Sequence, residues 1–160
     1  MTRSIPTRRY DERMLSYGPD TALIVVDVQN DFADPAGSLS VRGADAVVSR
    51  AHDEVLRAAA AGASVVYTQD WHPPSTAHFA KDGGIWPVHC VGETWGSEFH
   101  PDLVVDGPVV HKGVNGEDGY SGFTTRDPVT LETVPTELPK LLADGGSPSS
   151  SSPGSRPTTA

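Results

Sequence analysis

Cysteine is almost absent from this chain, since Cys90 is the only one among 160 residues. One thiol cannot form a disulfide within the chain, and such cysteine usage agrees with a reducing compartment. Long apolar runs are absent too. No segment approaches the roughly 20 apolar residues that a membrane-spanning helix needs, and no apolar stretch of an export signal follows Met1. We therefore expect a cytoplasmic protein with no membrane partner.

Positive charge is also scarce. The chain has 12 Lys and Arg against 21 Asp and Glu, which gives a formal net charge of −9. Nucleic acids and anionic membranes attract basic surfaces, so this balance argues against either as a partner. The length suits one domain with a real buried core.

The apolar pattern predicts an α/β fold. Residues 22–26 read Ala-Leu-Ile-Val-Val, a run with the length and β-branched content of a strand covered on both faces. Apolar residues recur at helical spacing over residues 44–61, and Gly62 supplies a stop. Residues 64–68 predict a second strand and residues 108–111 a short third one. The order strand, helix, strand predicts a βαβ unit and hence a parallel sheet.

The composition of the two ends sets the predicted domain boundaries. Residues 1–20 mix Arg, Asp and Glu with little apolar periodicity and predict a flexible lead-in. Residues 21–144 form the predicted domain, with a helix expected from Leu138. Residues 145–160 are rich in Ser and Pro, and we expect a disordered tail there because such a composition cannot build a core.

A cluster of metal-binding residue types follows the second predicted strand. Asp70, His72 and His78 occur close together, and His89 follows in Trp86-Pro-Val-His89-Cys90. One carboxylate and three imidazoles suit a divalent metal ion such as zinc, iron or manganese. The predicted loop of residues 70–107 is long, and loops of that length are usually functional.

Charged residues also stand at the ends of the predicted strands. Asp27, Asp70 and Lys112 each lie at or just past a carboxyl end. Ligands bind beyond the carboxyl ends of strands in open α/β sheets, so we expect these three groups to converge on one rim. Taken alone, Asp27 could be an ordinary strand-end carboxylate and Lys112 a solvated lysine.

Several segments resemble the nicotinamidase branch of the isochorismatase-like cysteine hydrolases. In chain order they are Ala22-Leu-Ile-Val-Val-Asp27-Val-Gln-Asn-Asp31-Phe32, Thr68-Gln-Asp70-Trp-His72, Trp86-Pro-Val-His89-Cys90-Val, and Lys112-Gly113 with Tyr120-Ser-Gly-Phe123. The resemblance implies a three-layer fold with a parallel sheet. It also implies hydrolysis of nicotinamide, a small aromatic amide, to nicotinate and ammonia in NAD salvage. The resemblance is also compatible with a homo-oligomer of the full-length form.

The resemblance also implies site roles. Asp27 corresponds to the general base and Lys112 to the lysine of a Cys, Asp, Lys triad. Phe32 and Trp86 correspond to the walls that sandwich the pyridine ring, with core packing as the equal alternative for both. The implied metal ligands are Asp70 and His72 with His78, His89 or both.

The nucleophilic cysteine of the family has no counterpart in the segments that carry the resemblance. It lies in a later Ala-Thr-Asp-x-Cys-Val turn, whereas Cys90 falls in the metal loop, where we expect a buried or metal-adjacent thiol. We therefore predict that the chain as printed lacks the nucleophile and is inactive. Our hypothesis is that a single-base frameshift near Gly146 has truncated the chain. Suitable codons for residues 147–160, when they are read in another frame, encode an apolar strand followed by Ala-Thr-Asp-Tyr-Cys.

Other functions compete with this interpretation. A metal-binding remnant without catalysis would take up metal without turnover. Vinyl ether cleavage, as in isochorismatases, does not need the metal set. A non-haem iron oxygenase shares the ligand types, but its all-β barrel does not fit the βαβ pattern. Of the other histidines, we expect His52 to be exposed on the helix, and His100 and His111 to be loop and strand-end residues and not ligands.

Overall fold

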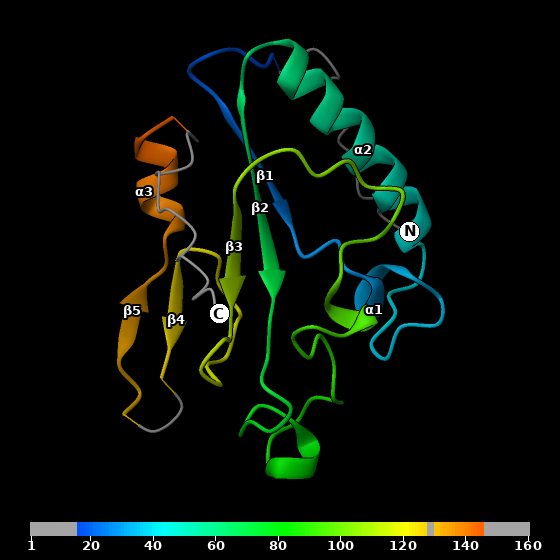
Figure 1. Ribbon diagram of the computed structural model, residues 1–160, viewed down its shortest axis with the longest axis vertical. Helices are drawn as coiled ribbons and strands as arrows, with labels where there is room; N and C mark the ends of the chain where they lie inside the picture. Colours follow the sequence, from blue (N-terminus) through cyan, green and yellow to red (C-terminus); the bar gives the residue numbers. More distant parts are fainter. Residues whose placement is uncertain (1–15, 128–129, 146–160) are drawn as a thin grey trace, which may run out of the picture.

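Three parallel strands form the centre of the molecule (Figure 1). The computed structural model describes residues 16–127 and 130–145. The strands are β1 (Ala22–Val26), β2 (Ser64–Asp70) and β3 (Val109–Lys112), in the order β1-β2-β3. The predicted α/β fold with a parallel sheet is confirmed. The frameshift hypothesis, most of the predicted tail and most of the predicted lead-in lie outside the described residues.

Helix α2 (Ala44–Ala60) connects β1 to β2 and covers one face of the sheet. Its buried side chains Val48 and Val55 belong to an apolar cluster that includes Val25 of β1 and Tyr67 of β2. The chain leaves the helix through Gly62, which has φ +75°, a conformation that glycine adopts without a side-chain clash. The predicted helix is confirmed to within one residue.

Helix α3 (Leu138–Ala143) covers the opposite face of the sheet. Leu138 and Leu141 pack against Val66 of β2 and Val110 of β3 in a second apolar cluster. Neighbouring residues of a strand point to opposite faces, which is why Val66 and Tyr67 belong to different clusters. Strand β2 is covered on both faces, which explains its continuous apolar run. The expectation that residues 22–26 are covered in the same way was wrong, because β1 is the edge strand and Val26 is 59% exposed.

Short elements occupy the connections. Helix α1 (Asn30–Ala33) follows β1, and the 3-10 helices η2 (Ala80–Asp82) and η3 (Trp95–Ser97) lie in the long segment between β2 and β3. A separate antiparallel pair joins β4 (Thr124–Arg126) to β5 (Thr133–Pro135). This pair was not predicted, because strands of three residues are too short to show a period. Among the described residues, no helix has the length and apolar character needed to cross a bilayer.

Two strand boundaries differ from the prediction at positions that matter. Strand β2 continues to Asp70, and β3 includes Lys112, so these two residues are register partners in the sheet. The polar residues at the end of β2 break the apolar pattern, yet Gln69 and Asp70 are buried because the following segment covers them. The sheet ladder therefore fixes the backbone of both charged residues.

Candidate functional site

The three charged residues predicted to converge do meet at the carboxyl ends of the strands. Asp70 and Lys112 are paired at the ends of β2 and β3. Asp27 follows β1, and its amide donates to the Thr68 carbonyl at 3.2 Å. Its φ of +52° is uncommon for a residue with a side chain and turns the chain out of the strand. Asp27 and Lys112 thus touch although they are 85 positions apart in the sequence.

Lys112 joins the two carboxylates. Its Nζ lies 2.6 Å from Asp27 Oδ2 and 3.0 Å from Asp70 Oδ1, and it donates to the Gly119 carbonyl at 2.6 Å. Burial lowers the pKa of a lysine, but the two carboxylates outweigh it and the pKa of Lys112 lies above its usual value. The side chain is 3% exposed, so a solvated lysine is excluded here.

The two carboxylates differ in their affinity for a proton. Burial and the charge of Asp70 raise the pKa of Asp27, and Lys112 and the Thr68 hydroxyl, which donates to Asp27 Oδ1 at 2.7 Å, offset this only in part. Burial also opposes ionisation of Asp70, but His72 and Lys112 outweigh it and lower its pKa. Asp27 is therefore the carboxylate that more readily accepts a proton, as a general base must.

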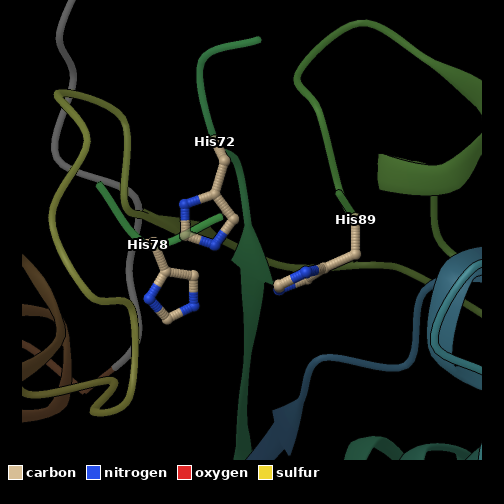
Figure 2. Close-up of side chains that lie close together, drawn as sticks. All are labelled: His72, His78 and His89. Atoms are coloured by element: carbon tan, nitrogen blue, oxygen red, sulfur yellow. The ribbon is translucent and has the colours of Figure 1, made fainter. Parts of the chain in front are cut away.

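Three imidazoles converge beside Asp70 (Figure 2). Ring nitrogens of His72, His78 and His89 lie within 4.8 Å of one another. Asp70 Oδ2 is 3.8 Å from His72 Nε2 and 3.9 Å from His89 Nε2. Burial and the neighbouring imidazoles lower the pKa of His78, which favours the neutral ring that can bind a metal. The structure brings all four predicted ligand residues together.

This donor set fits a divalent metal ion. His72 is buried, and neither of its ring nitrogens has a hydrogen-bond partner among the described residues, which is unfavourable unless another group binds them. His89 Nδ1 instead hydrogen-bonds with the Pro87 carbonyl at 2.7 Å, which leaves Nε2 for a metal. Imidazole and carboxylate ligands suit zinc, iron or manganese.

Aromatic side chains surround the imidazoles. The ring of Phe32 lies 5.5 Å from that of His89, and the ring of Trp86 lies 6.3 Å from that of His78, measured between centroids. Both are half-buried, and neither belongs to the two apolar clusters of the core. The Tyr120 hydroxyl accepts a hydrogen bond from Trp86 Nε1 at 2.8 Å. Phe32 and Trp86 thus offer partly open ring surfaces beside the cluster.

The single cysteine is buried, as predicted. Cys90 is 0% exposed, and its Sγ lies 3.8 Å from the Gly96 carbonyl. Burial and the nearby carboxylates raise the pKa of the thiol, so the nucleophilic thiolate is disfavoured. Cys90 is therefore poorly suited to attack a substrate.

The sequence prediction missed several polar side chains that fix the site. Gln29 Nε2 donates to the Asp70 carbonyl at 2.7 Å, and Gln29 Oε1 accepts from the Asp70 amide at 2.8 Å. Thr68 holds Asp27, and Tyr120 holds Trp86. For Gln29, the sequence did offer a signal, namely the polar run that directly follows β1. A turn from a strand into a loop does not by itself require such a run. His52, His100 and His111 contribute no ring nitrogen to the described cluster.

Comparison with known families agrees with this arrangement. Residues 21–129, more than half of the chain, match the sequence model of the isochorismatase domain. The chain belongs to the isochorismatase domain family. The matched span contains all three strands of the parallel sheet and every predicted site residue. The family assignment therefore covers both the fold and the site.

Nicotinamidases are among the most similar members of the isochorismatase domain family. The nicotinamidase/pyrazinamidase of Mycobacterium tuberculosis is 43% identical over 107 residues, which cover 64% of this chain and 56% of the relative. Pyrococcus horikoshii pyrazinamidase, solved in complex with zinc, has a TM-score of 0.68 and 37% identity over 80% of this chain and 66% of its own. PnC1 from L. infantum, solved in complex with nicotinate, has a TM-score of 0.72 and 33% identity over 82% and 65%.

The chain covers only part of these relatives. It spans 56% and 57% of the length of the first two curated proteins that it matches.

Proposed function

We propose that this chain carries the base, lysine and metal-binding residues of a nicotinamidase, an amidohydrolase that converts nicotinamide and water to nicotinate and ammonia in NAD salvage. The observation that carries the proposal is the buried Lys112, which joins Asp27 and Asp70 beside the cluster of His72, His78 and His89. The identities of 43% and 35% to two nicotinamidases support it, as does the family match over residues 21–129, which contain this site.

Each charged residue has a role in amide hydrolysis. An amide is a weak electrophile with a poor leaving group, so a thiol nucleophile needs a base that takes its proton and delivers it to the amide nitrogen, which leaves as ammonia. Asp27, whose pKa is raised, takes this role. The Lys112 ammonium holds Asp27 Oδ2 and stabilises negative charge near it. Cys90 does not supply the thiolate, because its thiol is buried.

The remaining residues hold the substrate. Asp70, His72, His78 and His89 would bind a divalent ion, which supplies a Lewis acid for the pyridine nitrogen. Phe32 and Trp86 would contact the two faces of the ring, and the Tyr120 hydroxyl fixes the indole of Trp86. A small aromatic amide with a ring nitrogen is therefore the proposed ligand.

Ligand binding tests this proposal without requiring turnover. Isothermal titration of the zinc-loaded chain should show binding of nicotinamide and nicotinate, and benzamide, which lacks the ring nitrogen, should bind at least about tenfold more weakly. Trp86→Ala should lose binding, whereas Trp95→Ala, a partly exposed tryptophan in η3, should keep it. Equal affinity for nicotinamide and benzamide would contradict the proposed orientation.

A metal-binding protein without catalysis is the second candidate function. The burial of Cys90 and the raised pKa of its thiol favour it, because no other thiol occurs in the sequence. It predicts zinc uptake without turnover. It requires no nicotinamide binding, and the titration with nicotinamide therefore separates it from the first candidate.

The cellular setting belongs to the proposal as well. The net charge of −9 supports the absence of nucleic-acid and anionic membrane partners. A cytoplasmic location and a homo-oligomer of the full-length form accord with a salvage enzyme and are proposed with it.

A further inference from the structure

The backbone of Cys90 links the two segments that carry His72 and His89. Its amide donates to Asp31 Oδ2 at 2.7 Å, and its carbonyl accepts from the His72 amide at 2.9 Å. Both sides of the residue that follows His89 are therefore held by hydrogen bonds. These two contacts hold the backbone next to His89, and the hydrogen bond between His89 Nδ1 and the Pro87 carbonyl holds the ring itself.

Cys90 has an unfavourable backbone conformation. Its φ is +46°, in the left-handed region that residues with side chains rarely adopt. Such a conformation persists only where the surroundings enforce it, and it is concentrated at functional sites. The hydrogen bond from the Cys90 amide to Asp31 is a contact that can enforce it, because it fixes the peptide between His89 and Cys90.

Asp31 is itself held rigidly in α1. The residue is 8% exposed, Oδ1 accepts the Ser38 amide at 3.0 Å, and its carbonyl accepts the Leu39 amide at 3.0 Å. Gly96 passes directly over the carboxylate, since a Cβ added there would lie 2.1 Å from Asp31 Oδ2. Both carboxylate oxygens thus accept hydrogen bonds from backbone amides, and the backbone at Gly96 leaves the carboxylate no room to shift.

We propose that Asp31 is a positioning residue that aims His89 at the metal by holding the Cys90 amide. Asp31 contacts neither the imidazoles nor the ring walls by hydrogen bonding, so it acts through the backbone. This inference rests on the proposed metal site and assigns a role to a carboxylate outside the ligand set. It also explains why a buried cysteine with a disfavoured φ follows His89.

Metal affinity of paired variants tests the inference. Asp31→Asn replaces one acceptor oxygen by a donor, so one of two backbone amides loses its acceptor. Gly96→Ala leaves the carboxylate chemistry intact and displaces it sterically. Asp34→Asn is the matched control, because Asp34 lies in the same segment and its side chain, within the described part of the chain, accepts just the nearby Ala36 amide at 2.8 Å.

The readouts are the zinc dissociation constant, measured by competition with a chelating dye, and the visible spectrum of the cobalt-loaded chain. Zinc affinity should fall by about tenfold or more in Asp31→Asn and Gly96→Ala, with a changed cobalt spectrum, and should be unaltered in Asp34→Asn. The melting temperature of the metal-free variants is recorded alongside, because a purely structural role would lower it without changing zinc affinity.

A double-mutant cycle with Cys90→Gly sharpens the test. Glycine adopts φ +46° without a side-chain clash and depends less on the hydrogen bond. The loss caused by Asp31→Asn should therefore shrink in the Cys90→Gly background by more than about twofold, the spread expected of independent sites. If Asp31→Asn alone does not fold, Gly96→Ala and the double variant carry the test.

The outcomes distinguish the two proposals. Wild-type zinc affinity in both Asp31→Asn and Gly96→Ala, or a lower melting temperature with unaltered affinity, overturns the role of Asp31. Failure of the unsubstituted chain to bind zinc overturns the metal site and this inference with it. Zinc binding without nicotinamide binding overturns the proposed function and leaves the role of Asp31 to be judged on its own data.

Discussion

At the residue scale, Lys112 carries a positive charge into the interior between Asp27 and Asp70. Removing an ammonium from water is costly, and here two carboxylates within 3.0 Å offset that cost. The sequence predicted that these three residues would converge, because each stands at a strand end. It did not predict the burial, which depends on the chain that covers the strand ends, including the Gly119 carbonyl.

We expect Lys112→Met to destabilise the metal-free chain strongly. The substitution leaves the buried Asp70 and the half-buried Asp27 without their cation, and breaking a buried ion pair in this way costs about 3 to 5 kcal/mol. The measurement is the free energy of unfolding in urea, with chelator present so that no metal compensates the carboxylates.

Lys81→Met is the matched control for Lys112→Met. Lys81 is 45% exposed and pairs with Asp82 at 2.6 Å, and exposed pairs contribute about 1 kcal/mol or less. Similar losses in the two variants would show that Lys112 is not the buried cation described here.

At the element scale, the two helices that cover the sheet differ in how well the sequence revealed them. Helix α2 was predicted from its periodic apolar residues and Gly62. The helix expected from Leu138 is also confirmed, but α3 is only six residues long, so the sequence offered little period from which to place its end. Its packing is nevertheless complete, because Leu138 is 0% exposed against Val66 and Val110. A short helix is stabilised here by tertiary contacts, since isolated helices of this length are unstable in water.

Leu138→Ala should therefore reduce stability by about 2 to 5 kcal/mol, the cost of removing a fully buried leucine side chain and leaving a cavity. Urea unfolding of the chain measures the change. Leu56→Ala in α2 is the matched control, because Leu56 is 50% exposed and its substitution should change stability by less than about 0.5 kcal/mol. An equally small effect at both positions would mean that α3 does not pack on the sheet as described.

At the scale of the whole molecule, the site is assembled from segments that are distant in sequence. The proposed metal ligands come from the end of β2 and from the segment that follows it, the proposed base follows β1, and Lys112 ends β3. None of these segments forms the site alone. The parallel sheet is the element that brings their ends to one rim.

We expect the zinc-loaded polypeptide of the printed sequence to release no ammonia from nicotinamide above a control of zinc alone. The physical reason is that its one thiol, Cys90, is buried and has a raised pKa, so the thiolate required for attack is scarce. The assay is coupled detection of ammonia.

A thiol probe supplies the independent check on the ammonia assay. Iodoacetamide should modify Cys90 slowly in the native chain at neutral pH and rapidly in urea, because only unfolding exposes the thiol. Ammonia release that disappears in Cys90→Ser would show instead that this cysteine acts as a nucleophile.

The sequence by itself determined the α/β class, the strand ends that bear Asp27, Asp70 and Lys112, and the ligand types of the metal cluster. These follow from local apolar periodicity and from residue chemistry, which short segments carry on their own. Only the tertiary structure decided that Lys112 is buried, that Gln29 and Asp31 hydrogen-bond to the backbone of Asp70 and Cys90, and that Cys90 has a positive φ. Those properties arise from contacts between segments far apart in the chain, and such contacts leave no periodic signal in the sequence.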